Sequence, residues 1–250
     1  MTDPYVNVDQ HDQVAYVEFF HPAHNSLPSN ILAELVEVIN RMGEDDSVQV
    51  IVLKSGGNRT FCAGASFKEL VSIQDKEQGL VFFSGFANVI NAMRKCPKFI
   101  IGRIQGKAVG GGVGLASATD YCMATQYASI KLSELNIGIG PFVIGPAVSR
   151  KVGLSAMSQL AIDANSFYEA NWAKEKGLYT QVFDTTEELD EAIADFARNL
   201  SQYNPAAMRQ MKQMFWEGTD HWDQLLLDRA AISGELVLSD FTRETLKRFR

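Results

Sequence analysis

The chain has 250 residues, 46% of them hydrophobic and 21% charged, which is enough to form one sizeable hydrophobic core. The formal net charge of −7 argues against a nucleic-acid-binding protein, because such proteins normally carry a basic surface. No apolar stretch reaches the roughly 18 residues of a membrane span, and the first residues do not resemble a secretory signal. We therefore expect a cytoplasmic protein without membrane contact.

The cysteines Cys62, Cys96 and Cys122 are scattered along the chain and form no Cys-x-x-Cys pair. The four histidines show no His-x-x-x-His spacing either. These patterns give little support to a disulfide framework or a metal site, so we predict no bound metal. Each cysteine is expected to be a small buried side chain.

Strands and helices are predicted to alternate through the first half of the chain. Residues 48–54 and 99–104 are continuous apolar runs, which is the pattern of strands that are buried on both faces. Helices are predicted from apolar spacing, and the longest of them is stopped by Pro97. The predicted strands are residues 14–20, 48–54, 99–104, 121–124 and 128–132, and the predicted helices are residues 30–42, 65–73, 78–95 and 115–118.

The second half is predicted to be mainly helical, with one strand at residues 180–183. Strand–helix alternation followed by helices indicates an α/β core with a C-terminal helical part. The predicted helices are residues 147–152, 155–162, 167–176, 187–201 and 205–217, and a final amphipathic segment runs from residue 222 to the end.

Two segments place small residues between a strand and a helix. The first, residues 60–70, reads Thr-Phe-Cys-Ala-Gly-Ala-Ser-Phe-Lys-Glu-Leu, and the second, residues 105–116, contains Gly110-Gly111-Gly112. A nucleotide-binding loop is not supported, because neither Gly-x-Gly-x-x-Gly nor Gly-Lys-Ser/Thr is present in this context. If the two turns converge, their free N–H groups form an oxyanion hole, where each donor is worth roughly 3 kcal/mol.

These segments resemble the two signatures of the enoyl-CoA hydratase/isomerase (crotonase) family. Residues 61–69 look like its Phe-x-Ala-Gly-Ala-Asp-hydrophobic-Lys motif, with Ser66 in place of the aspartate, and residues 105–120 are similar to its second motif. Residues 22–27 match its N-terminal loop, and residues 165–182 resemble a later helix–strand pattern. The resemblance runs from about residue 10 to about residue 215.

The resemblance implies a single family domain with a ββα-spiral core at residues 1–190 and a C-terminal helical trimerisation region at residues 191–250. It further implies a homotrimer or a hexamer built as a dimer of trimers, and an acyl-CoA thioester as substrate. Coenzyme A is then part of the substrate, and no separate cofactor is expected. The backbone N–H groups of Ala65 and Gly111 would be the oxyanion donors.

Substrate contacts can be carried over in the same way. Lys68 and a terminal cation, Lys247 or Arg248, are candidates for the phosphates of coenzyme A, although a solvated surface position explains these charges equally well. The expected contacts with coenzyme A or the acyl group are Ala23, Ala63, Ala65, Ser66, Phe67, Lys68, Gly111 and Gly114, and residues 135–143 are expected to form part of the acyl pocket.

The sequence departs from the family at one of its two catalytic glutamates. Gly114 stands where the first is expected, whereas Glu134 matches the second. Apolar neighbours should raise the pKa of Glu134 toward values useful for acid–base catalysis, although a capping or surface role is the competing interpretation. Glu69 and Asp75 are weaker candidates for replacing the missing carboxylate.

Three functions remain open. Residues 135–143 resemble relatives that hydrate short branched substrates such as methylglutaconyl-CoA, so hydration of a 2-enoyl-CoA is slightly favoured. Conversion of a 3-enoyl-CoA to a 2-enoyl-CoA follows closely, because a single carboxylate such as Glu134 suits a proton shift. A coenzyme A-binding protein without catalysis is the third, prompted by Gly114.

Overall fold

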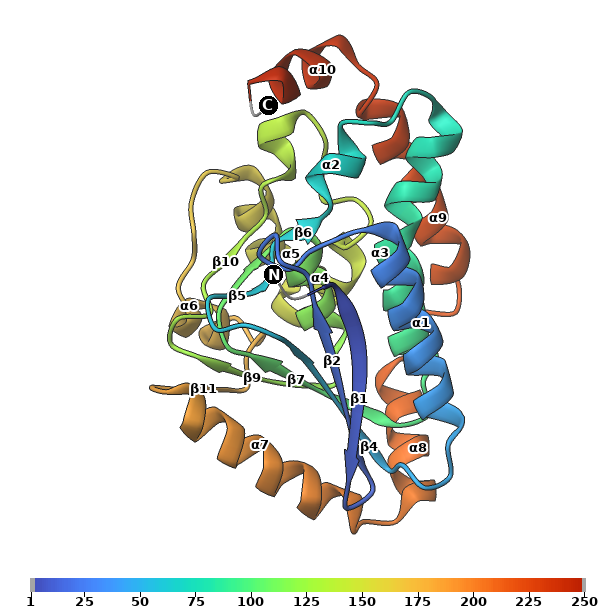
Figure 1. Ribbon diagram of the computed structural model, residues 1–250, viewed down its shortest axis with the longest axis vertical. Helices are drawn as coiled ribbons and strands as arrows, with labels where there is room; N and C mark the ends of the chain where they lie inside the picture. Colours follow the sequence, from blue (N-terminus) through green and yellow to red (C-terminus); the bar gives the residue numbers. More distant parts are fainter. Residues whose placement is uncertain (1–2, 249–250) are drawn as a thin grey trace.

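The computed structural model describes residues 3–248, and its centre is a six-stranded sheet (Figure 1). The strand order is β1-β2-β4-β7-β9-β11, in which β1 pairs antiparallel with β2 and every other neighbour pair is parallel. The strands are β1 (Tyr5–His11), β2 (Val14–Phe20), β4 (Val50–Ser55), β7 (Phe99–Ile104), β9 (Tyr121–Thr125) and β11 (Gln181–Phe183).

Both faces of the central strands β4 and β7 are buried, which explains their continuous apolar runs. In β4, Val50 and Val52 pack against Leu189 and Ile193 of α7 (Thr186–Ser201) on one side. The intervening Ile51 and Leu53 belong to the main core on the other side. That core also receives α1 (Ser29–Glu44) and α3 (Lys76–Lys95), which lie along one flank with α9 (Trp222–Leu236) (Figure 1).

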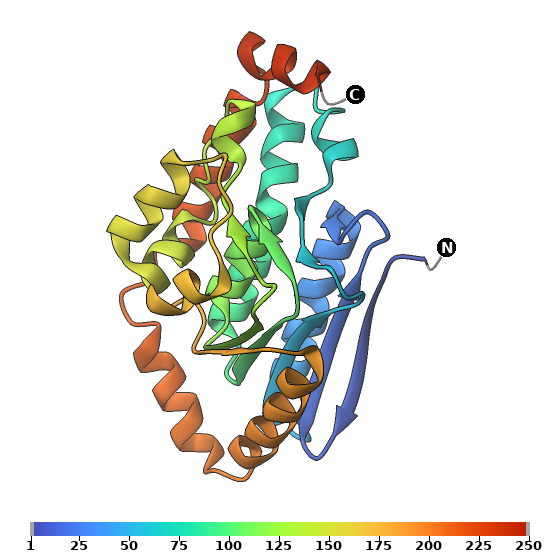
Figure 2. The ribbon, with the colours of Figure 1, turned by 90° about the vertical axis from the view of Figure 1, so that its left-hand side faces the viewer.

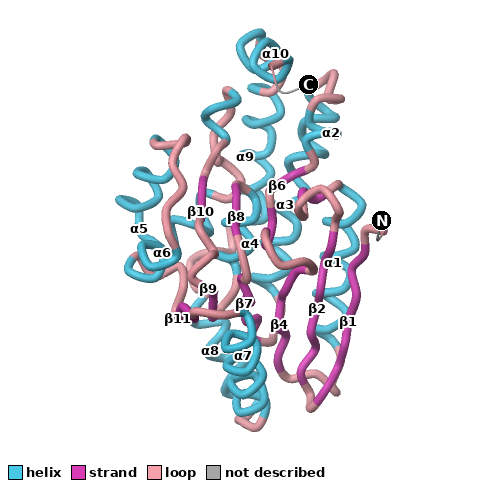
Figure 3. Tube along the Cα trace, turned by 60° about the vertical axis from the view of Figure 1, so that its left-hand side comes forward, coloured by secondary structure: helices cyan, strands magenta, loops and turns pink. Residues whose placement is uncertain are grey.

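Short parallel strands form a second level beyond the main sheet, where they carry the glycine-rich segments (Figure 3). One small sheet has the order β10-β8-β5, and the other pairs β3 with β6. The strands are β3 (Ser26–Leu27), β5 (Thr60–Cys62), β6 (Gly64–Ala65), β8 (Lys107–Val109) and β10 (Ile130–Lys131).

Helices also cover the two ends of the molecule. Figure 2 shows α7 and α8 at one end and α10 at the other. Within residues 3–248, no helix is long and apolar enough to cross a membrane. The remaining helical elements are α2 (Phe67–Leu70), α4 (Gly111–Ala118), η1 (Glu134–Ile137), α5 (Gly145–Ile162), α6 (Ala170–Glu175), α8 (Pro205–Phe215) and α10 (Asp240–Lys247).

Most predicted elements are confirmed, with three corrections. The helix predicted at residues 65–73 is the single turn α2, because residues 64–65 pair as β6 and Ser66 caps the turn that follows. The predicted helix at 167–176 is shortened to α6, because Tyr168 bridges to Ile130. Strand β1 and the short strands β3, β5, β6 and β8 are not predicted from the sequence. The two helices predicted at 147–152 and 155–162 are both present in α5, which kinks at Gly153 with φ 77°.

Candidate functional site

The two glycine-rich segments converge in space, which the sequence alone left open. Strand β5 pairs in parallel with β8, so the chain that leads to Ala65 runs beside the chain that leads to Gly111. A Cβ atom added to Gly64 would lie 3.2 Å from the carbonyl oxygen of Val109 and 3.6 Å from the backbone nitrogen of Gly111. The two segments therefore meet at Gly64 and Gly111.

Each glycine of the triplet is in close contact with a different neighbour. Gly110 has φ 52°, a left-handed conformation that favours glycine. A Cβ atom on Gly111 would lie 2.4 Å from Phe86 Cζ, and one on Gly112 would lie 2.4 Å from the carbonyl oxygen of Cys62. Gly111 is also the first residue of α4, where a backbone N–H has no acceptor within the helix and lies at the positive end of its dipole.

A cavity of about 500 Å³ opens at the meeting point of the two segments. Its wall is mainly apolar and comes from β6, α2, α3, α4, η1 and the loop before α5. It is lined by Ser26, Ala63, Gly64, Ala65, Phe67, Leu70, Phe82, Phe83, Phe86, Val109, Gly110, Gly111, Lys131, Ser133, Glu134, Asn136, Ile137, Ile139, Gly140, Pro141, Phe142, Val143, Ile144 and Ser233.

Five of the site residues predicted from the sequence line this cavity, and so do residues 136, 137 and 139–143 of the predicted acyl-pocket segment at residues 135–143. The five residues are Ala63, Ala65, Phe67, Gly111 and Glu134.

Four others predicted to bind substrate lie outside the lining. Ser66 caps α2 by accepting the N–H of Glu69 at 3.3 Å. Ala23 and Lys68 are exposed, and Gly114 is buried in the core. The two terminal cations proposed for phosphate binding lie at the surface, where Lys247 is paired with Glu244 and Arg248 is exposed.

Glu134 lies at the start of η1, directly against the glycine triplet. A Cβ atom on Gly110 would be 2.9 Å from Glu134 Oε1. Its other oxygen, Oε2, is buried and has no hydrogen-bond partner among the described residues. Burial raises the pKa of Glu134 to about 7, which outweighs the opposing effect of the backbone N–H groups of Glu134 and Ser133. The carboxyl group can therefore exchange a proton near neutral pH.

The position of the missing glutamate is filled by Ile144. A Cβ atom on Gly114 would lie 2.4 Å from Ile144 Cγ2 and 2.8 Å from Ile144 Cβ. Neither weaker candidate replaces the carboxylate, because Glu69 accepts hydrogen bonds from Ser29 and Asp75 caps α3 at Gln78. Among the described residues that line the cavity, Glu134 is the one carboxylate.

Helix α3 contributes three phenylalanines to the cavity wall that are not predicted as site residues from the sequence. Phe82, Phe83 and Phe86 recur at helical spacing, a pattern that indicates a buried face and does not distinguish a core from a cavity wall. Ser233 of α9 also lines the cavity and lies next to Gly234, which crosses Gly79 of α3 backbone to backbone. No sequence signal links these distant positions.

Comparisons with known proteins agree with this arrangement. A sequence profile described as enoyl-CoA hydratase/isomerase matches residues 9–240. The mitochondrial methylglutaconyl-CoA hydratase of Mus musculus is 32% identical over 200 residues, and that match covers 78% of this chain but only 63% of the mouse protein. The peroxisomal Delta(3,5)-Delta(2,4)-dienoyl-CoA isomerase of Arabidopsis thaliana is 28% identical, with 90% of this chain and 85% of that protein covered.

A solved structure shows the same fold. The crystal structure of enoyl-CoA hydratase from Bacillus halodurans matches with a TM-score of 0.90 at 20% identity, covering 98% of this chain and 99% of that chain. The predicted crotonase-like α/β fold is thereby confirmed.

Proposed function

This chain belongs to the enoyl-CoA hydratase/isomerase family, and we propose that it converts an apolar 3-enoyl-CoA to the 2-enoyl-CoA. The observation that carries the proposal is Glu134, the single carboxylate among the described residues that line the cavity, beside two converging glycine-rich segments. Ile144 occupies the space beside Gly114, so a second acid–base group has no room there.

The proposed reaction is a proton shift between two carbons. The Glu134 carboxylate removes a proton from the second carbon of the acyl group, and the electron pair delocalises toward the thioester oxygen. The N–H groups of Ala65 and Gly111 hold the negative charge that develops on this oxygen, each worth roughly 3 kcal/mol. The protonated Glu134 then delivers its proton to the fourth carbon, as the double bond moves from carbons 3 and 4 to carbons 2 and 3.

The wall of the cavity supports an apolar acyl group. Phenylalanine and aliphatic side chains dominate it, and Lys131 is its one cationic residue among those described. Lys131 Nζ donates to the carbonyl oxygen of Asn165 at 2.9 Å and lies 5.2 Å from the centre of the Phe167 ring. A carboxylate on the acyl chain would have this one cation as a counter-charge, whereas the rest of the described lining favours an apolar chain.

Hydration of a branched 2-enoyl-CoA is the second candidate function. It is supported by the 32% identity to a methylglutaconyl-CoA hydratase, and one glutamate with a well-placed water could carry both proton transfers. It ranks second because water attack and proton delivery usually use two acid–base groups, and the cavity offers one carboxylate among the described residues.

The two reactions are separated by their products in heavy-oxygen water. The enzyme would be incubated with a 3-enoyl-CoA, crotonyl-CoA and 3-methylglutaconyl-CoA, and the products resolved by mass. We expect an unlabelled 2-enoyl product from the 3-enoyl substrate. Labelled 3-hydroxyacyl products from the other two would establish hydration instead, and inertness toward all three would contradict both proposals.

The isomerase activity is expected to increase with pH through a midpoint near 7. Burial raises the pKa of Glu134 from 4.5 to about 7, so the carboxyl is protonated below this pH and cannot accept a proton. The measurement is kcat/KM for a 3-enoyl-CoA between about pH 4 and pH 9. A midpoint near the ordinary value of 4.5 would contradict a desolvated base.

The far end of the cavity is expected to limit the length of the acyl chain. From Phe86, beside Gly111, to Gly79, where α9 crosses, α3 rises about 10 Å over about seven residues. Bonds of about 1.5 Å advance an extended chain by about 1.3 Å per carbon, so this span holds about eight carbons.

Replacing Ser233 with leucine should therefore shorten the accepted chain. We expect about a tenfold loss of kcat/KM for a ten-carbon 3-enoyl-CoA and little change for a six-carbon one, because overfilling a packed site typically costs about 1–3 kcal/mol. The control is Ile232→Leu, an exposed neighbour on α9. An equal loss for both substrates would show that Ser233 does not lie at the chain end.

We also propose that the protein assembles as a trimer or as a dimer of trimers, with residues 191–250 supplying contacts. On α8, the apolar residues Met211, Met214 and Phe215 are exposed at helical spacing, which supports a covered surface. Sedimentation equilibrium distinguishes monomer, trimer and hexamer by mass. Coenzyme A is proposed to be part of the substrate, and no further cofactor is proposed.

A further inference from the structure

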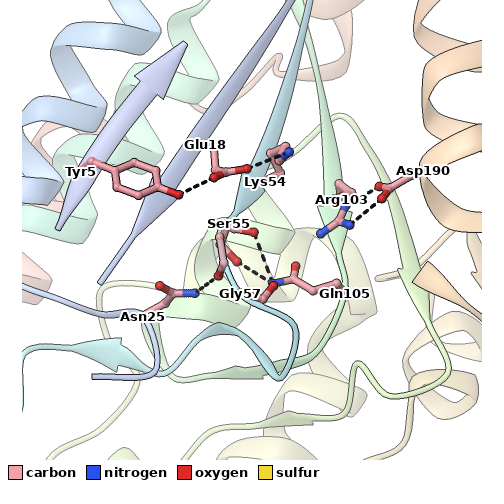
Figure 4. Close-up of polar contacts among 10 residues, drawn as sticks. Tyr5, Glu18, Asn25, Lys54, Ser55, Gly57, Arg103, Gln105 and Asp190 are labelled. Atoms are coloured by element: carbon pink, nitrogen blue, oxygen red, sulfur yellow. Dashed lines mark hydrogen bonds and ion pairs between the residues drawn. The ribbon is translucent and has the colours of Figure 1, made fainter. Parts of the chain in front are cut away.

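Gln105 has a buried amide side chain whose nitrogen makes several hydrogen bonds while its oxygen makes none with the described residues. It lies between β7 and β8 and is 1% exposed. Its Nε2 donates to Ser55 Oγ at 2.9 Å and to the carbonyl oxygen of Gly57 at 3.1 Å (Figure 4). It also lies 3.4 Å from the carbonyl oxygen of Thr60. Its Oε1 is buried without a hydrogen-bond partner among the described residues. The side chain thus acts as a donor toward one loop.

The same loop, residues 55–60, is held from its other side by Asn25. Asn25 is 3% exposed, and its Nδ2 donates to the carbonyl oxygens of Gly56 at 2.9 Å and Thr60 at 3.0 Å. Both amides therefore reach the carbonyl oxygen of Thr60, which is the first residue of β5. The loop is fixed where the chain enters the first glycine-rich segment.

Gln105 also belongs to the second glycine-rich segment through its own backbone. Its carbonyl oxygen accepts from Thr125 Oγ1 at 2.8 Å, and Gly106 follows immediately. A Cβ atom on Gly106 would lie 2.4 Å from the carbonyl oxygen of Arg59, so the two chains touch here. Beyond this contact, one chain continues to Ala65 and the other to Gly111.

We infer that Gln105 is a positioning residue that fixes the separation of the Ala65 and Gly111 N–H groups. Its backbone begins one segment while its side chain holds the beginning of the other. The inference rests on the proposed use of these two N–H groups as oxyanion donors. Because an oxyanion hole depends on donors at a defined distance from the oxygen, loosening this connection lowers the polarisation of a bound thioester.

A chromophoric thioester measures this polarisation without turnover. The probe is 4-dimethylaminocinnamoyl-CoA, which has no proton on its fourth carbon to exchange and whose absorption shifts to longer wavelength when its carbonyl oxygen accepts hydrogen bonds. Wild-type protein is expected to shift the absorption on binding. In Gln105→Met, which keeps the length but removes the donor, we expect a smaller shift, kcat lowered about 10- to 100-fold and KM little changed.

The control is Arg103→Met, a substitution in β7, the strand that directly precedes Gln105. Arg103 is 7% exposed and pairs with Asp190 of α7, away from both segments (Figure 4). It should lose stability without changing the absorption shift. If Gln105→Met does not fold, Ser55→Ala removes one acceptor of the amide and should give an intermediate shift.

The outcomes separate the two levels of the proposal. A wild-type shift that Gln105→Met retains in full, together with lower stability, would reduce Gln105 to a packing role and overturn the inference. No shift in wild type would overturn the oxyanion assignment and the inference with it. A shift that depends on Gln105 supports the inference even if the 3-enoyl-CoA reaction is not catalysed.

Discussion

Replacing Glu134 with glutamine is expected to lower kcat for a 3-enoyl-CoA by about 10²- to 10⁴-fold, the range typical of losing a general acid–base group. Glutamine keeps the size of the side chain but cannot carry a proton between two carbons. KM should change little, because Oε2 has no hydrogen-bond partner among the described residues and Oε1 lies against Gly110. The measurement is steady-state kinetics at pH 8 with the substrate that the wild type isomerises.

The same variant should be more stable relative to wild type at pH 8 than at pH 4. Burial raises the pKa of Glu134 above its ordinary value of 4.5, so the folded protein favours the neutral carboxyl. The stability that this preference contributes is complete below about 4.5 and is lost as the pH rises to about 7. Glutamine does not ionise, so it escapes the loss.

The matched control for Glu134 is Glu69→Gln. Glu69 accepts hydrogen bonds from Ser29 and does not line the cavity. Its replacement should therefore leave kcat within about twofold of wild type, because substitutions away from the site have small effects. A Glu134→Gln variant that turns over as fast as wild type would contradict the assignment of Glu134 as the proton carrier. A loss of kcat with unchanged pH dependence of stability would point to a solvated carboxyl.

The strands that could be predicted from the sequence are those whose burial on both faces requires a run of apolar residues. Strands β4 and β7 are covered on both faces, so residues 50–53 and 99–101 form continuous apolar runs. Strand β1 lies at the edge of the sheet with most of its residues exposed, and its polar residues give no such run. Its turn through Asp12 and Gln13 has positive φ at both positions without glycine or asparagine, so the usual hairpin signal is absent.

The residues of the candidate site that could be predicted are those at positions where only one residue type fits the contacts or the chemistry. Glycines at 110–112 are required by close contacts, and the position of Glu134 follows from the family motif, so both could be named from the sequence. Ile144 and Phe86 could not, because their roles arise from which segments of the fold meet. An apolar residue beside a glycine has the same sequence signature whether it fills the core or shapes a cavity.

Asp120, which lies between α4 and β9, links strand β7 to helix α8 through its side chain. Its Oδ2 accepts from the N–H of Ile100 at 2.8 Å and pairs with Lys212 Nζ at 2.8 Å. Its Oδ1 accepts from Trp216 Nε1 at 3.0 Å. Lys212 is 1% exposed and donates also to the carbonyl oxygen of Lys98 at 2.7 Å, so this ion pair is fully enclosed.

Replacing Lys212 with methionine is therefore expected to lower the free energy of unfolding by about 3–5 kcal/mol, because it leaves Asp120 buried without its counter-charge. Urea unfolding followed by tryptophan fluorescence measures the loss, since Trp216 lies in the same network. Lys174→Met, an exposed lysine on α6, is the control and should change the value by less than about 0.5 kcal/mol. A Lys212→Met loss below about 1 kcal/mol, the value of a surface pair, would contradict an enclosed pair that holds α8 against the sheet.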